Sequence, residues 1–182
     1  MIDAATAIVE AEGEQALTLS RVARELGVKP PSLYSHVAGL DSLRRDVALR
    51  AVNALADRLA TAAMGRTGRQ ALIAIAAEVR AFAVAHPGLY ELTTRARPND
   101  EEYAAASMRP VEPVLAILRG YDLAEDEAIH AARMLRAALH GFVSLESVGG
   151  FGLDTDMEDS FAWMVERLAD SLESSTLRPG VV

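Results

Sequence analysis

Apolar side chains recur every three or four residues along most of the chain, which is the spacing of one face of an α-helix. The first such segment carries Ile2, Ala5 and Val9 on one side and ends near Gly13. Segments in which apolar and polar residues alternate, as in a half-buried β-strand, are nearly absent from the sequence. The pattern therefore predicts an all-α protein with about nine helices.

Longer helical segments follow downstream, each bounded by residues that end or cap helices. Asn99 is expected to cap one of them, and Pro110 and Pro113 are expected to kink or break it, because proline lacks the N–H that a helix interior needs. The remaining predicted helices lie at about 39–63, 67–85, 89–95, 124–148 and 156–173.

Residues 17–37 contain two short helical segments with a break between them. Thr18 is placed to cap the first segment and Gly27 to end it, because glycine adopts positive φ at low cost. The second begins at Pro30 and Pro31, whose missing N–H groups would be unpaired in a first helical turn anyway. This arrangement predicts a helix-turn-helix, although spacing alone also fits an ordinary pair of packed core helices.

The second segment of this motif divides into an inner and an outer face. Leu33 and Val37, four residues apart, are expected to point into the core. In a helix-turn-helix the leading end of the second helix enters the major groove of DNA and contacts base edges. The polar residues expected on that outer face are Lys29, Ser32, Tyr34, Ser35 and His36.

Charge is divided unevenly along the chain. The formal net charge is -8, which by itself argues against a nucleic-acid partner. Residues 17–50, however, hold six basic and three acidic residues, whereas the residues after 50 hold 12 basic and 19 acidic ones. The asymmetry predicts a small basic head attached to an acidic body.

Several functional classes find no support in the sequence. There is no cysteine for a disulfide or a thiolate metal site, and no G-x-S-x-G nucleophile motif. The chain opens with neither the charged region nor the apolar block of a signal peptide, and no apolar run approaches the roughly 20 residues of a membrane span. We therefore expect a cytoplasmic protein that is not an enzyme and binds no cofactor. The four histidines also lack metal-binding spacing: His36, His86, His130 and His140.

The spacing of small, apolar and aromatic residues in the first 50 positions resembles the N-terminal domain of the tetracycline-repressor (TetR) family. The matching positions are Ile2, Ala5, Gly13, Leu17, Thr18, Val22, Ala23, Leu26, Gly27, Val28, Leu33, Tyr34, His36, Val37 and Leu43. A second stretch, residues 135–153, resembles the C-terminal domain of a TetR subgroup named for a Trp-His-Gly element. Here Leu139 precedes His140 and Gly141 in place of the tryptophan.

The resemblance implies a transcriptional regulator, usually a repressor, that binds a palindromic DNA operator as a homodimer and is released by a small-molecule ligand. It implies a helix-turn-helix DNA-binding domain over 1–46, a helical effector-binding and dimerisation domain over 47–175 and a flexible tail over 176–182. Thr18 and Arg21 would contact phosphates. The recognition surface would consist of Lys29, Pro30, Pro31, Ser32, Tyr34, Ser35 and His36.

One position departs from the family pattern in a way that affects DNA affinity. Leu40 stands where relatives often carry a phosphate-binding lysine. Each phosphate contact releases counterions, so one contact fewer makes the salt dependence of DNA binding shallower by about one unit.

The larger C-terminal part contains candidates for a dimer interface. The helix over 124–148 has two neighbouring apolar rows, which implies burial on two sides. In the last helix Trp163 lies among charged residues, which is typical of an interface edge, although it could instead fold onto its own loop in a monomer. The predicted interface residues are Leu139, Gly141, Leu145, Phe161, Trp163 and Leu168.

The same part of the chain is expected to hold the effector. An apolar pocket with few polar groups suits a hydrophobic or aromatic ligand. Its predicted wall residues, any one of which could equally be ordinary core, are Phe82, Tyr90, Tyr103, Met108, Leu115, Met134 and Phe142. The alternative function is a helical module that binds a small molecule or a protein partner and has little or no DNA binding.

Overall fold

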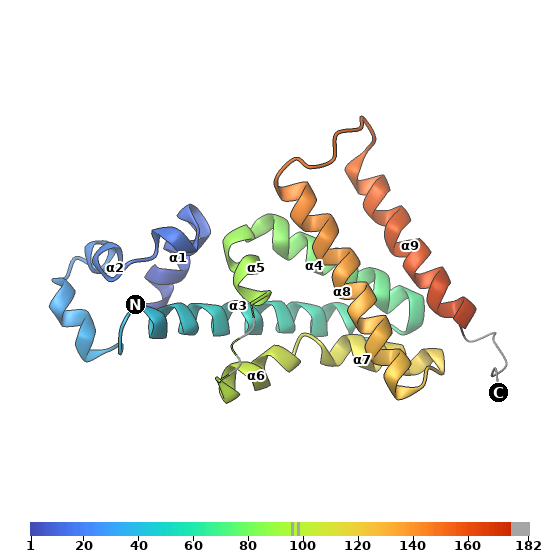
Figure 1. The fold of residues 1–182 in the computed structure, drawn as a ribbon, viewed down its shortest axis with the longest axis horizontal. Helices are drawn as coiled ribbons and strands as arrows, with labels where there is room; N and C mark the ends of the chain where they lie inside the picture. Colours follow the sequence, from blue (N-terminus) through green and yellow to red (C-terminus); the bar gives the residue numbers. More distant parts are fainter. Residues whose placement is uncertain (96, 98, 176–182) are drawn as a thin grey trace. The chain divides into compact units, whose positions relative to one another are not determined.

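The computed structural model describes residues 1–95, 97 and 99–175, so the tail predicted at 176–182 lies outside the described residues. In this described part the secondary structure is entirely helical, with nine α-helices and three short 3₁₀ helices, as the hydrophobic pattern predicts (Figure 1). The chain forms two compact units. The first comprises Met1–Ala54 and Ala85–Ser107, and the second comprises Leu55–Val84 and the chain from Met108 onward.

The first unit contains the helix-turn-helix and two later helices that return to it. Its apolar interior includes Val9 of the first helix, Leu17 in the connection that follows and Val22 of the second helix, each with none of its surface exposed. The elements of this unit are α1 (Ile2–Glu12), η1 (Glu14–Ala16), α2 (Leu19–Glu25), η2 (Pro30–Ser35), the first part of α3 (Leu40–Ala63), α5 (Pro87–Thr93) and most of α6 (Glu101–Met108).

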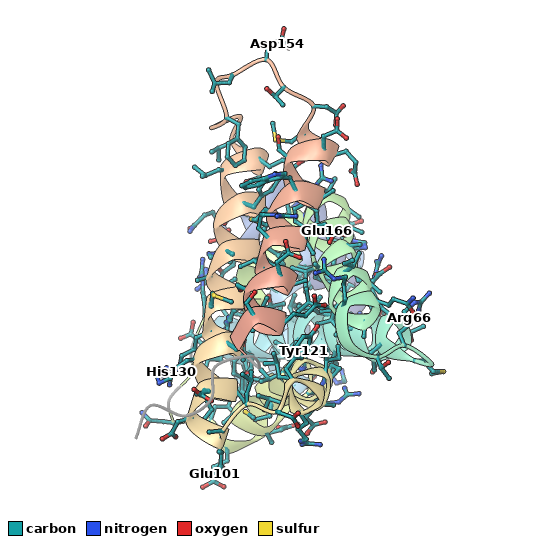
Figure 2. All side chains as sticks on the ribbon, turned by 90° about the vertical axis from the view of Figure 1, so that its right-hand side faces the viewer. Arg66, Glu101, Tyr121, His130, Asp154 and Glu166 are labelled. Carbon is teal, nitrogen blue, oxygen red and sulfur yellow. The ribbon has the colours of Figure 1, made fainter. Side chains whose placement is uncertain are left out.

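The second unit begins within α3, which continues into it from the first. Two long helices, α8 and α9, run side by side in both views and are joined by a loop with Asp154 at its tip (Figures 1 and 2). Helix α7 packs against α8. The elements here are the remainder of α3, α4 (Gly68–Ala85), α7 (Glu112–Leu118), η3 (Arg119–Tyr121), α8 (Glu125–Ser147) and α9 (Met157–Ser175).

The prolines interrupt the helix after residue 100 as predicted, since α6 ends at Met108 and α7 begins at Glu112. The cap of α6 is one residue later than expected. Asp100, not Asn99, accepts the backbone N–H of Tyr103, at 3.0 Å. A capping side chain bonds the N–H three residues along the chain, and Asp100 is in addition held by an ion pair with Arg45.

No helix in the described ranges is long and apolar enough to cross a membrane.

Candidate nucleic-acid interface

The helix-turn-helix begins at a capped α2. The Thr18 hydroxyl oxygen accepts the backbone N–H of Arg21 at 3.1 Å, which confirms the predicted cap. After α2 the chain reverses at Gly27, whose φ of 67° lies in the left-handed region that glycine adopts without strain. The Val28 N–H then donates to the Ala23 carbonyl at 2.9 Å, a bond that satisfies a carbonyl at the end of the helix.

The segment after the turn is a 3₁₀ helix with Pro30 and Pro31 in its first turn. Leu33 is 3 % exposed and Val37 is 6 % exposed, so the predicted inner face is confirmed. Tyr34 is 64 % exposed. Lys29, Pro30, Pro31, Ser32, Ser35 and His36 are exposed as well.

The Ser35 hydroxyl on this outer face has a defined hydrogen bond. The Ser35 hydroxyl donates to the Ser32 carbonyl at 2.8 Å, which uses the only hydrogen that this hydroxyl has. The oxygen of Ser35 therefore remains free to accept. A base amino group of adenine or cytosine, or a bridging water, is the kind of donor that suits it.

The three cations of the helix-turn-helix fall into two groups. Arg21 forms ion pairs with Glu12 at 2.8 Å and Glu25 at 2.6 Å, and the hydrogen bond to Glu25 followed by that to Glu12 raises the pKa of Arg21 above its ordinary value. Lys29 and Arg24 have no acidic partner among the residues that the structure describes. The cation at the leading end of η2 is therefore available to a phosphate or a base edge, whereas Arg21 shares its charge with two carboxylates.

Two hollows of different size lie within the described part of the second unit. The larger of these two, of about 560 Å³, lies between the end of α3, the start of α4 and α7. The smaller, of about 450 Å³, lies between α4 and α9, with Arg80 and Glu146 among its lining residues. Arg80 is pinned there by ion pairs to Glu146 and Glu158.

Comparison with known proteins decides the family. A model of the tetracyclin repressor-like C-terminal domain matches residues 72–168. The HTH-type transcriptional regulator Rv0681 of Mycobacterium tuberculosis is 37 % identical over 182 residues, which covers 99 % of this chain and 83 % of that protein. This chain belongs to the TetR family. It is a DNA-binding transcriptional regulator of the helix-turn-helix type.

One further relative and one solved structure resemble this TetR-family chain. The HTH-type transcriptional repressor DrrR1 of Streptomyces coeruleorubidus is 34 % identical over 136 residues, covering 74 % of this chain and 48 % of the repressor. The crystal structure of a TetR variant from Acinetobacter baumannii AYE in complex with minocycline superposes with a TM-score of 0.71. It is 20 % identical and covers 97 % of this chain and 96 % of that one, so it shows the shared fold.

The effector residues predicted for this TetR-family regulator lie in both units. Tyr90 and Tyr103 belong to the first unit, and the Tyr103 hydroxyl donates to the Leu92 carbonyl at 3.0 Å. The other five belong to the second unit: Phe82, Met108, Leu115, Met134 and Phe142. None of the seven lines either of the two hollows described above. Their role in effector binding stays a prediction.

The lining of the larger hollow was not foreseen from the sequence. Its α3 side is formed by Ala56, Ala60 and Ala63, which recur at helical spacing on one face. Alanine at such positions is more often read as close packing of two helices, so the pattern by itself gives no sign of a space. The signal that could have pointed to it is a facing pair of small residues, Ala116 on α7 and Gly120 on η3.

The predicted dimer residues of the TetR-family chain differ in exposure. Leu139 is 8 % exposed and Phe161 is 5 % exposed, so both are already buried within the single chain. Gly141 and Leu168 are half-buried. Leu145 is 47 % exposed and Trp163 is 68 % exposed, with the Arg167 guanidinium 6.0 Å from the indole ring. An interface role for these residues stays a prediction as well.

Proposed function

We propose that this regulator binds a palindromic operator as a homodimer, represses transcription there and is released by a small apolar or aromatic effector. The observation that carries the proposal is the outward presentation of the segment from Lys29 to His36. Its outer side chains are exposed while Leu33 and Val37 anchor it in the core. A rigid, proline-started segment held in this way is suited to insertion into a major groove.

Self-association is supported by large apolar side chains that are exposed on the second unit. Trp163 on α9 and Leu145 on α8 are large apolar side chains with about half or more of their surface open. Burying them against a second copy would remove apolar area from water. A two-fold dimer would place two copies of η2 on one face of the DNA, about 34–36 Å apart or a multiple of that distance.

Release requires that effector binding changes the geometry of the heads. Helix α3 is suited to that role because it starts directly after the recognition segment and continues from the first unit into the second. The effector can shift the equilibrium only by its difference in affinity between the DNA-binding and released forms. In this account the regulator acts in the cytoplasm, beside its DNA, and release involves no catalysis and no cofactor.

The test is a binding titration on an inverted repeat from the DNA upstream of the chain's own reading frame. We expect two protomers on the repeat and tighter binding than on a scrambled fragment of equal length. Inserting about five base pairs between the half-sites turns one of them to the opposite face of the duplex and should greatly weaken binding, whereas inserting a full turn should restore it. Equal binding to all of these fragments would contradict the proposal.

A further inference from the structure

The larger hollow of the second unit has two apolar walls of small side chains. One wall is α3, where Ala56, Ala60 and Ala63 occupy successive turns of one face. The other wall is formed by α7, which contributes Pro113, Ala116 and Ile117, and by η3, which contributes Gly120. Small side chains on both walls leave about 560 Å³ of space between them. That volume lies within the range of about 300–1,000 Å³ typical of small-molecule sites.

Polar groups gather at the rim of this hollow. Arg66, Thr67, Arg109 and Glu112 all line it, and Arg66, Arg109 and Glu112 are exposed. Figure 2 places Arg66 at the outer edge of the second unit. The hollow is open to solvent, since Ala60 and Ala116 of its walls are exposed as well, and it combines apolar walls with polar groups at its mouth. That combination suits an amphipathic molecule.

The two arginines of the rim are not equivalent. Arg109 donates to the Asp57 carboxylate at 2.7 Å, so its charge is partly balanced. Arg66 donates one hydrogen bond to the Ala62 carbonyl at 2.8 Å and has no acidic partner in the described part of the chain. A guanidinium has five N–H donors, so Arg66 is held in place while most of its donors stay available. A carboxylate is the group that best matches such a planar donor set.

We propose that this hollow binds a small monocarboxylate with an apolar body. The apolar part lies between α3 and α7, and the carboxylate pairs with Arg66. The negative charge of Glu112 at the same mouth repels an anionic ligand and lowers its affinity for the hollow. A ligand with a second acidic group is therefore disfavoured. Only the consequence of this binding, release of DNA, rests on the function proposed above.

The first test compares three probes of equal chain length by titration calorimetry on the full chain. Decanoate carries a carboxylate, decan-1-ol is neutral and decylamine is a cation at neutral pH. We expect decanoate to bind more tightly than decan-1-ol, and decylamine to bind least. Tightest binding of decylamine would overturn the inference, because Glu112 rather than Arg66 would then dominate the mouth.

The second test fills the hollow. Ala60→Phe and Ala116→Phe each place a ring on one wall, and each should weaken decanoate binding at least about tenfold. Both positions are exposed, so the fold should tolerate the substitution. Ala105→Phe is the matched control, because Ala105 is an exposed alanine of α6 outside the hollow, and it should leave the affinity unchanged. Unchanged affinity in both wall variants would overturn the site.

The third test measures the effects of Arg66 and Glu112 on binding one at a time. Arg66→Gln should weaken decanoate binding about tenfold and leave decan-1-ol unaffected, because only the carboxylate uses the guanidinium. Glu112→Gln should strengthen decanoate binding. Arg133→Gln, an exposed arginine of α8 outside the hollow, is the control and should change neither probe. An equal loss for decanoate and decan-1-ol in Arg66→Gln would contradict a carboxylate contact.

These binding measurements contain no DNA, so they stand apart from the proposed function. Operator release by decanoate is measured separately, by fluorescence anisotropy of the labelled operator. Loss of DNA binding with decanoate, abolished by Ala60→Phe, would identify the hollow as the effector site. Binding at the hollow without release would support the site and contradict its role as effector site.

Discussion

The backbone of Gly88 lies so close to the carbonyl oxygen of Val9 that a β-carbon on residue 88 would stand 2.3 Å from that oxygen. Gly88 is in the first turn of α5, and Val9 is a fully buried residue of α1. A hydrogen bond between His86 Nδ1 and the Glu10 carboxylate, at 2.7 Å, links the residue that precedes α5 to α1. Helix α1 of the first unit is therefore packed against α5 by a contact that only glycine permits.

Replacing Gly88 by alanine should destabilise the first unit. The added methyl group meets backbone atoms, which cannot move aside as a flexible side chain could, and overpacking of this kind costs about 1–3 kcal/mol. We expect a lower midpoint of thermal unfolding, measured by circular dichroism, and weaker operator binding at temperatures near that midpoint. Gly152→Ala is the control, since a β-carbon there meets nothing within 4 Å. Equal midpoints for the two variants would show that α5 shifts freely on α1.

Asp100 should make the stability of the first unit dependent on pH in the acid range. Hydrogen bonds from Arg45, then the backbone bond from Tyr103, lower the pKa of Asp100 from 3.8 to about 2. The unfolded chain then takes up this proton at higher pH than the folded chain does. The contribution of Asp100 to stability is therefore complete above about pH 5 and is lost as the pH falls toward 2.

The variant Asp100→Asn isolates this effect, because asparagine can still cap α6 but cannot carry the charge. In urea unfolding the variant should be less stable than the parent at pH 7, and the difference should shrink steadily as the pH approaches 2. Asp154→Asn, at the tip of the loop between α8 and α9, should show no such convergence (Figure 2). A difference that stays constant with pH would mean that the ion pair with Arg45 contributes nothing.

Glu25 should weaken DNA binding by neutralising Arg21. Its carboxylate, which is 48 % exposed, lies 2.6 Å from the Arg21 guanidinium on the surface of α2. The double variant Glu12→Gln/Glu25→Gln should bind the operator several-fold more tightly, with a salt dependence steeper by about one unit, because Arg21 then has neither carboxylate partner and its contact with DNA releases counterions. Glu25→Gln alone keeps the pair with Glu12 at 2.8 Å and should give a smaller change of the same sign. Anisotropy titrations at several salt concentrations measure both quantities. No change in the salt slope would remove Arg21 from the set of phosphate contacts.

Trp163 should matter for self-association more than for folding. It is 68 % exposed in the single chain, so truncation to alanine removes little packing within one protomer. If a second copy buries the indole ring, the truncation costs about 2 kcal/mol, which is about thirtyfold in the dissociation constant of the dimer. Sedimentation equilibrium measures it. Tyr34→Ala is a matched control, since Tyr34 is 64 % exposed and belongs to the proposed DNA surface. Similar dissociation constants for both variants would place the interface elsewhere.

The local features of the head could be predicted from the sequence because they follow from single residues. The cap at Thr18, the reversal at Gly27 and the inward direction of Leu33 depend on chemistry within three or four positions of the chain. The type of helix in η2 was harder to predict from the sequence. Two prolines fix the first turn, but the choice between 3₁₀ and α over six residues depends on what packs beneath it.

Features that join distant parts of the chain could not be predicted in the same way. Nothing near Gly88 in the sequence indicates that Val9 lies against it, and the ion pair between Arg45 and Asp100 spans 55 positions. The larger hollow also depends on parts of the chain that are distant in the sequence. Alanines at helical spacing on α3 fit a tight helix contact and an open one equally well, and only the placement of α7 decides between them.

The claim on which the rest depends is that the exposed segment from Lys29 to His36 binds DNA. The most direct measurement is the affinity of the parent chain and of Tyr34→Ala for the upstream fragment and for a scrambled fragment, at one salt concentration. The parent should prefer the upstream fragment, and the variant should lose affinity for both fragments by a similar factor, as expected for a phosphate contact. Equal affinity of parent and variant for both fragments would contradict that claim.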